Sequence, residues 1–122
     1  MIRPTYKELD KKLTQAKEAI SKDKICLLEQ DVIVIDALEL GYEVKNIQTI
    51  LLELLTNVTP RHYVGTYPPQ KSYEEDILDR ELFAFMVNSK RFGCEVYMKY
   101  VLKSEILYLV SFHQHRDKEQ TK

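Results

Sequence analysis

Hydrophobic residues in the first half of the chain recur at helical spacing. A first apolar stripe, whose members lie three or four residues apart and so predict a helix, consists of Leu9, Leu13, Ala16 and Ile20. Thr5 and Glu8 precede this stripe at the spacing of a capping box, so we expect the helix to begin just after Thr5. A second stripe of the same kind predicts a helix over residues 47–55 and consists of Ile47, Ile50, Leu51, Leu54 and Leu55.

Residues 25–41 fit two interpretations. Ile25–Leu28 is typical of a short strand, and the β-branched run Val32–Ile35 favours a strand by intrinsic propensity. The segment that follows runs into Gly41, and glycine is typical of the position just after a helix C-terminus. We therefore expect a helix from about residue 30 to residue 40, with a strand over Val32–Ile35 as the alternative.

The character of the sequence changes after Pro60. Gly65 and the pair Pro68–Pro69 predict a loop. Three strand-like segments follow at residues 82–88, 94–102 and 106–113, and the links between them have hairpin length. The sequence therefore predicts an α+β fold in which N-terminal helices pack on a C-terminal antiparallel β-sheet.

The link between the last two strands determines which residues face each other. A three-residue loop at 103–105 pairs Leu102 with Ile106, and the further pairs are then Lys99 with Leu109, Tyr97 with Ser111 and Glu95 with His113. Facing residues project to the same side of a sheet, so Tyr97, Lys99 and His113 are expected on one polar face. The same face would carry Val101, Leu107 and Leu109. The opposite face would enter the core and consists of Val96, Met98, Tyr100, Leu102, Tyr108, Val110 and Phe112.

The composition is that of a globular protein. The 122 residues are enough for one domain and too few for two ordinary ones, so we expect a single domain over residues 1–122. The polar segment 117–122 is expected to be a disordered tail. Lys and Arg number 18 against 19 Asp and Glu, a net charge of −1, which excludes a strongly basic, nonspecific nucleic-acid binder. Any RNA site must therefore be a local patch.

The cysteines and the apolar segments bear on localisation. Cys26 and Cys94 form no C-x-x-C motif and are too few for a disulfide framework, which favours a reduced setting. No apolar stretch has the length of a signal-peptide core or of a membrane span. We expect a cytoplasmic protein without a membrane partner.

The expected polar face carries residue types suited to RNA cleavage. RNA is cleaved when its 2′-hydroxyl attacks the adjacent phosphate, a reaction that needs acid–base groups and positive charge. His113 is the candidate acid or base, Tyr97 would orient the phosphate, and Lys99 would offset the developing charge. The alternative is an ordinary exposed sheet face with scattered polar residues. His113 and His115 match no standard zinc spacing with the cysteines or His62, and we expect no cofactor.

Four segments, in this order, carry a resemblance to a known family: Asp36–Tyr42, His62–Tyr63, Gly93–Lys99 and Leu109–His113. Together they resemble the MqsR (motility quorum-sensing regulator) toxins, within the wider RelE-like toxin group, over roughly residues 3 to 114. The resemblance implies a small α+β ribonuclease that cleaves mRNA without a metal. It also implies a cognate antitoxin protein as partner, with the ribosome as a further candidate partner.

The family's site residues match this chain unevenly. Tyr97 and Lys99 match the family's Val-Tyr-hydrophobic-Lys strand, in which the Tyr belongs to the active site. His113 stands where the family has a catalytic Lys in Ser-Phe-Lys. The Lys of the family's Phe-Tyr-Lys-Ser motif is missing from residues 62–65, and His62 or Lys71 is the candidate replacement. The family's Trp-Gln-Asp-Val-Tyr stretch is not recognisable near residues 79–83.

The resulting hypothesis is the toxin of a type II toxin–antitoxin system, acting as an endoribonuclease, that is, an mRNA interferase. Its expected catalytic residues are His113, Tyr97, Lys99 and His62, and its expected substrate-binding residues are Arg116, Lys71, Tyr67 and Arg91. The alternative is a non-catalytic regulatory or protein-binding module with a RelE-like fold, which the near-neutral charge favours slightly.

Overall fold

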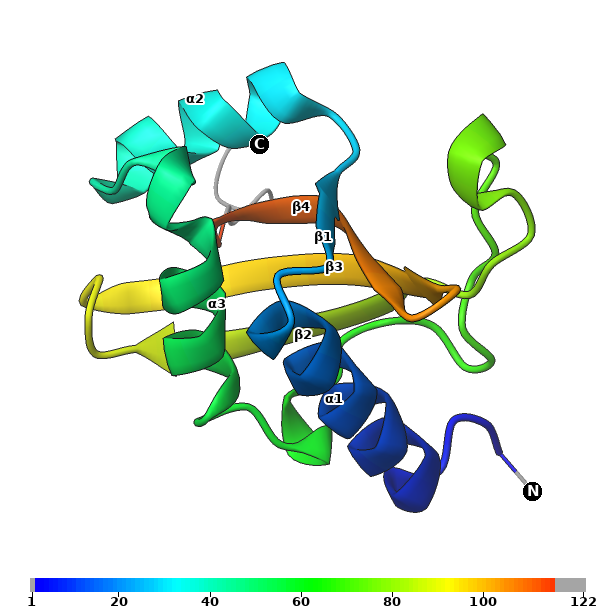
Figure 1. Cartoon of the computed structure of the whole chain (residues 1–122). Helices are drawn as coiled ribbons and strands as arrows, with labels where there is room; N and C mark the ends of the chain where they lie inside the picture. The colour runs from blue at the N-terminus through cyan, green and yellow to red at the C-terminus, as the bar shows by residue number, and fades with distance from the viewer. Residues whose placement is uncertain (1, 116–122) are drawn as a thin grey trace, which may run out of the picture.

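The structure is a computed structural model that describes residues 2–115; Arg116 and the expected tail lie outside the described residues. The α-helices of the described part are α1 (Tyr6–Ser21), α2 (Gln30–Leu40) and α3 (Ile47–Leu55). The strands are β1 (Ile25–Leu27), β2 (Phe83–Ser89), β3 (Cys94–Lys103) and β4 (Ile106–Gln114). Short 3-10 turns occur at η1 (Val44–Asn46), η2 (Pro60–His62) and η3 (Glu75–Ile77). Figure 1 shows α1 and α3 side by side against the sheet.

The helix ends follow the local sequence signals. At the start of α1, the Glu8 amide donates to Thr5 Oγ1 (3.1 Å) and the Thr5 amide donates to Glu8 Oε1 (3.4 Å), which is the expected capping box. At the end of α2, Gly41 adopts φ +91°, a left-handed conformation that favours glycine. The helix expected over residues 30–40 is therefore confirmed, and the strand alternative for Val32–Ile35 is wrong.

The four strands form one mixed sheet in the order β1-β4-β3-β2. β2, β3 and β4 are antiparallel neighbours, as expected for a meander. β1 pairs with β4 in parallel, with Cys26 opposite Tyr108. The α+β class is thus confirmed, whereas the expectation of a purely antiparallel sheet is wrong because β1 comes from between the first two helices.

The expected pairing of β3 with β4 is also wrong. The link is a two-residue turn: Ser104 and Glu105 both have positive φ (53° and 64°), and Lys103 pairs with Ile106. A β-bulge then shifts the register between Lys99 and Tyr100. Beyond the bulge the pairs are Val96 with Gln114, Tyr97 with His113, Met98 with Phe112 and Lys99 with Ser111.

The two-residue turn and the bulge together determine which side chains of β4 enter the core. Leu107 and Leu109 are fully buried and belong to the main core, although the sequence placed them on the polar face. Tyr108 and Val110, expected in the core, are partly exposed instead. Past the bulge the alternation returns to the expected phase, and Phe112 is fully buried as expected.

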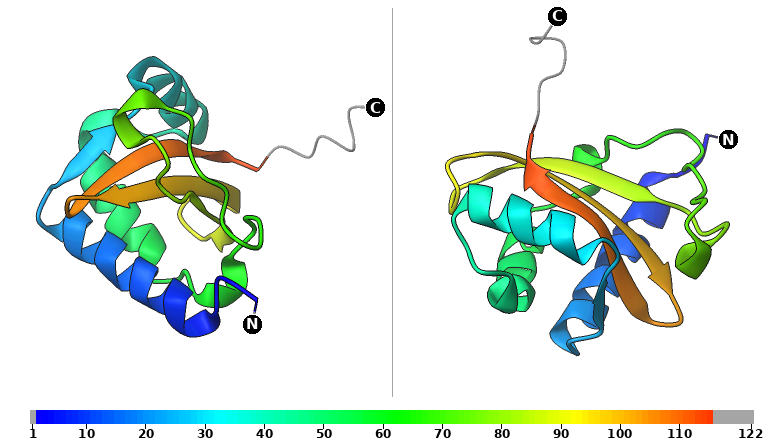
Figure 2. Two further views of the ribbon diagram at one scale, coloured as in Figure 1. Left: turned by 90° about the vertical axis from the view of Figure 1, so that its right-hand side faces the viewer. Right: turned by 90° about the horizontal axis from the view of Figure 1, so that it is seen from above.

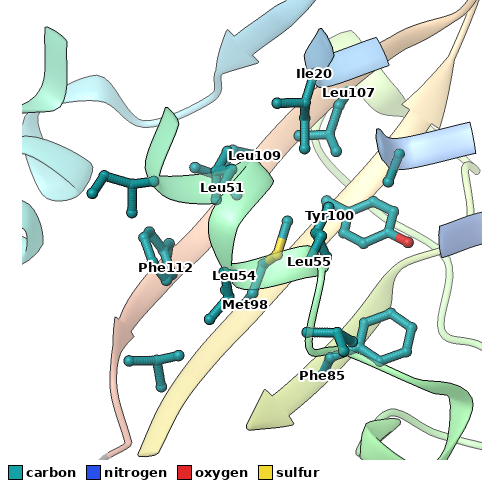
Figure 3. Close-up of a cluster of buried hydrophobic side chains, with 14 of the residues drawn as sticks. Ile20, Leu51, Leu54, Leu55, Phe85, Met98, Tyr100, Leu107, Leu109 and Phe112 are labelled. Carbon is teal, nitrogen blue, oxygen red and sulfur yellow. The ribbon is translucent and has the colours of Figure 1, made fainter. Parts of the chain in front are cut away.

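The main core lies between the sheet and the helices. Figure 3 shows Met98, Tyr100 and Phe112 from the sheet meeting Leu51 and Leu55 of α3. All of these side chains are buried, which is the main source of stability for a domain of this size. The buried phenol of Tyr100 donates a hydrogen bond to the Lys12 carbonyl of α1 (3.1 Å), so this polar atom is satisfied.

The long segment of residues 63–82 joins η2 to β2 and runs along the outer edge of β2. The Val64 amide donates to the Ala84 carbonyl (2.8 Å), and the Leu82 amide donates to the Gln70 carbonyl (2.8 Å). Figures 1 and 2 show its η3 turn standing beside the β3–β4 hairpin. There Lys103 Nζ donates to the Asp76 carbonyl (2.7 Å). No helix in residues 2–115 is both long enough and apolar enough to cross a membrane.

Candidate functional site

The side chains of Tyr97 and His113 form a stacked pair on the sheet face opposite the main core. The two residues face each other across β3 and β4, and their ring centroids lie 5.3 Å apart with an interplanar angle of 26°. Both residues are partly exposed. The sequence placed these residues on one face, and the structure brings them into direct contact through the register that the bulge creates.

The contact of His113 with the backbone favours one tautomer of its ring. Nδ1 of His113 lies 2.7 Å from the carbonyl oxygen of Gln114. A carbonyl oxygen only accepts, so this contact is a hydrogen bond when Nδ1 carries the proton, and Nε2 of that neutral tautomer holds a lone pair. His113 is therefore prepared to accept a proton at Nε2.

Lys99 lies two residues along β3 from Tyr97 and faces Ser111 on β4. Lys99 and Val110 line an open hollow of about 420 Å³ together with the segment 70–75. Lys71 lines the same hollow, so the two lysines expected from the sequence come together there. Glu74 and Glu75 line the same hollow, so carboxylates offset the charge of the two lysines there, and the Tyr97–His113 pair lies outside its lining.

The hollow also contains residues that the sequence analysis did not identify. Tyr73 is 89% exposed and lines it, and so do Gln70 and the buried Ser72. Ser72 Oγ accepts a hydrogen bond from the Glu74 amide (3.0 Å), which fixes the turn there. No sequence signal could have found this group, because the contact joins a loop to strands about thirty residues away.

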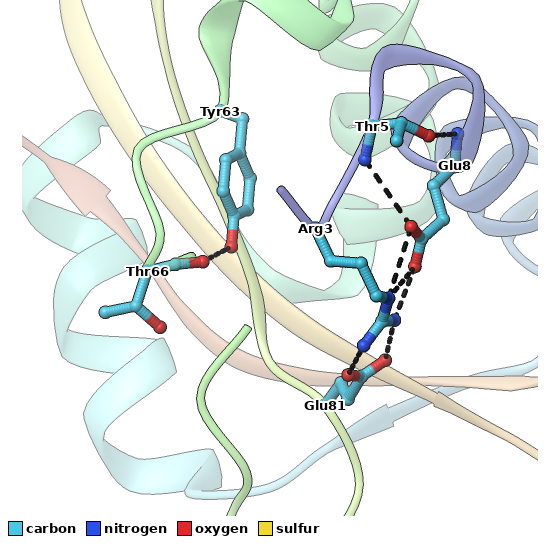
Figure 4. Close-up of polar contacts among 6 residues, drawn as sticks. All are labelled: Arg3, Thr5, Glu8, Tyr63, Thr66 and Glu81. Carbon is cyan, nitrogen blue, oxygen red and sulfur yellow. Dashed lines mark hydrogen bonds and ion pairs between the residues drawn. The ribbon is translucent and has the colours of Figure 1, made fainter. Parts of the chain in front are cut away.

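Polar contacts hold the start of this loop (Figure 4). The Tyr63 hydroxyl donates to the Thr66 carbonyl (2.6 Å). Farther along, the Arg3 guanidinium bridges Glu81, just before β2, and Glu8 on α1, at 3.1 Å from an oxygen of each. The loop is thus attached to the sheet edge and to the first helix.

Burial shifts two phenols near the site. Burial raises the pKa of Tyr97, so its phenol stays protonated and able to donate near neutral pH. Burial and then the neighbouring Tyr67 raise the pKa of Tyr63 to about 12. Tyr67 packs edge-on against Tyr63, with ring centroids 5.2 Å apart, and is 56% exposed. Tyr67 therefore presents a free ring surface on the loop.

His62 has a different environment. Its Nδ1 accepts a hydrogen bond from the Thr59 amide (2.9 Å), which caps the η2 turn against α1. Within residues 2–115, the His62 ring makes no hydrogen bond or ring contact with Tyr97 or His113. The structure thus assigns His62 a capping contact and does not join it to the other expected catalytic residues.

The structure does not place either of the two expected substrate-binding arginines at the Tyr97–His113 pair. Arg91 lies in the turn between β2 and β3, where it forms a bidentate ion pair with Glu53 of α3 (3.0 Å for Nη2). This pair lies on the helix side of the sheet. Arg116 falls outside the described residues.

The comparisons with known proteins and the search for metal ligands add no further residues. No protein-family model matches the chain, and no curated protein matches it significantly. Within residues 2–115 no group of three or more His, Cys, Asp or Glu side chains is arranged to hold a metal ion.

Proposed function

We propose that the protein is an endoribonuclease of the RelE-like toxin type, cleaving mRNA by attack of the 2′-hydroxyl on the adjacent phosphate. The observation that supports this most directly is the His113 tautomer, with a free Nε2 lone pair beside a protonated Tyr97 phenol. The resemblance in the Gly93–Lys99 and Leu109–His113 segments supports the same assignment.

Each residue of the pair has a distinct chemical role in the proposed reaction. His113 Nε2 takes the 2′-hydroxyl proton, the 2′-oxygen forms a bond to phosphorus, and the bond from phosphorus to the 5′-oxygen breaks. The Tyr97 phenol donates a hydrogen bond to a phosphate oxygen, and the Lys99 ammonium offsets the developing charge. The leaving 5′-oxygen takes a proton from water, and the other product carries a 2′,3′-cyclic phosphate.

The proposal also includes the toxin's cellular role. The protein would act in the cytoplasm on mRNA and be inhibited by an antitoxin protein, with the ribosome as a further candidate partner. Its alternative, a non-catalytic module of the same fold, predicts no cleavage at all.

The decisive experiment incubates the purified protein with RNA in excess chelator and analyses the new ends. We expect cleavage in chelator with 2′,3′-cyclic or 3′-phosphate ends. His113→Ala should lower the rate by about 10²- to 10⁴-fold, the usual contribution of an acid–base group. His115→Ala is the matched control, because it removes the same side chain two residues away. Intact RNA with folded wild-type protein, or cleavage that returns only with added magnesium, would contradict the proposal.

A further inference from the structure

Helix α2 is apolar on the side that faces solvent as well as on the side that faces the core. Ile33 and Ala37 are buried against the sheet. On the opposite side, Val32, Ile35 and Leu38 are 48%, 59% and 69% exposed. Because they are spaced three residues apart, these side chains form one stripe along the outer surface of the helix. We call Val32, Ile35 and Leu38 the α2 stripe.

The α2 stripe ends at a groove. Leu38 lines a hollow of about 570 Å³ between the C-terminal end of α2 and α3, together with Tyr42, Ile50 and Arg91. An exposed apolar stripe that continues into a partly apolar groove is typical of a protein interface. A ligand helix laid along the stripe could place one apolar side chain in this groove.

The charges around the α2 stripe select the kind of partner. Residues 25–44 contain no Lys or Arg, and Glu29 and Asp31 lie at one end of the stripe. At the groove the charges are paired, since Glu43 forms an ion pair with Lys45 (3.8 Å) and Arg91 forms one with Glu53. The acidic end at Glu29 and Asp31 disfavours RNA and favours a partner that carries Lys or Arg beside its apolar residues. Two copies joined symmetrically through this face would bring their acidic residues together, which disfavours a homodimer there.

We propose that the α2 stripe and its groove bind a basic amphipathic segment of another protein. The segment Arg116–Lys122 contains no large apolar side chain, so it does not supply the apolar residues that the stripe would bind. The stripe and its groove share no residue with the Tyr97–His113 pair, and the inference stands whether or not the protein cleaves RNA.

The test uses the full chain and a synthetic helical peptide of Leu and Lys, with Leu at the i, i+3, i+4 and i+7 positions. We expect it to bind, and Ile35→Ser to weaken binding about tenfold, the effect of removing one apolar contact worth about 1.4 kcal/mol. Ile35 is 59% exposed, so this substitution should leave the fold intact. Val64→Ser, which changes a 47% exposed residue far from α2 in the sequence, is the matched control and should bind normally.

Three results would overturn the inference. Equal binding by wild type and Ile35→Ser would show attraction by charge alone. Equal binding of a peptide with Glu in place of Lys would show that the surface does not select a basic partner. Self-association of the wild type that Ile35→Ser abolishes, measured by light scattering, would identify a second copy as the occupant.

Discussion

Neighbouring residues Phe112 and His113 should respond in opposite ways to truncation. Phe112 is fully buried and its ring lies 5.9 Å from Tyr42 and 6.4 Å from Phe92, between centroids. Replacing such a ring by alanine removes its contacts and leaves a cavity, at a cost of about 3–5 kcal/mol. His113 points to the other face and is half-buried, so His113→Ala should cost only about 1 kcal/mol.

The expected destabilisation by Phe112→Ala is large compared with the total free energy of unfolding. A domain of this size is usually stable by about 5–15 kcal/mol, so Phe112→Ala should leave a marginal fold. With a urea dependence of about 2 kcal/mol per molar, its unfolding midpoint should fall by about 2 M, and that of His113→Ala by about 0.5 M. Circular dichroism during urea titration measures both variants.

The comparison has a clear contrary result. If His113→Ala lowered the midpoint as much as Phe112→Ala, the two side chains would not alternate across the sheet. The register past the bulge would then be incorrect, and the stacking of His113 on Tyr97 with it.

Two further predictions concern the loop and the surface charges. Gly65→Ala should lower stability by about 1–3 kcal/mol, seen as a lower melting temperature, because the added Cβ would lie 2.6 Å from the Tyr63 hydroxyl; an unchanged melt would contradict this packing. The hydrogen bond from the Arg91 guanidinium holds the pKa of Glu53 below its ordinary value of 4.5. The ion pair therefore stabilises the folded state above pH 4.5, and this stabilisation is lost as the pH falls through the folded-state pKa of Glu53. Glu53→Gln should therefore lose less stability than wild type between about pH 5 and about pH 3 in urea titrations, and an equal loss would refute this.

The sequence was a good guide where the signal was local. The capping pair at Thr5 and the glycine at position 41 predicted helix boundaries within a residue, because the backbone groups they satisfy lie in the same turn. Phe112 was also placed in the core correctly. These features need no knowledge of distant parts of the chain.

The predicted pairing of β3 with β4 was wrong because the turn and the bulge that determine it carry no sequence signal. The tight turn uses Ser104 and Glu105 at positive φ, where glycine or asparagine is the usual residue. Residues 106–110 are apolar on both faces, so their pattern cannot show where a bulge interrupts the alternation. The parallel pairing of β1 is equally hidden, since it joins three residues to a strand some eighty positions later.

For the candidate site, the sequence predicted the residue types on β3 and β4 but not their neighbours. Lys99 and Lys71 line one hollow, whereas Tyr97 stacks on His113 outside that lining. The hollow that Lys99 shares with the loop 70–75, and the capping role of His62, depend on how the loop folds back on the sheet. Such long-range contacts cannot be inferred from spacing.

The hydrogen bonds along the two sheet edges have a consequence for solubility. An edge strand with free amides and carbonyls can recruit strands from other molecules and start aggregation. Here the β2 edge is partly occupied by the bridge of Tyr63 with Phe85, and a second bridge, of Lys71 with Glu81, lies just before β2. The β1 edge offers only three residues before the chain turns into α2. Loosening the segment 63–71 should therefore promote fibrillar self-association before the core itself unfolds.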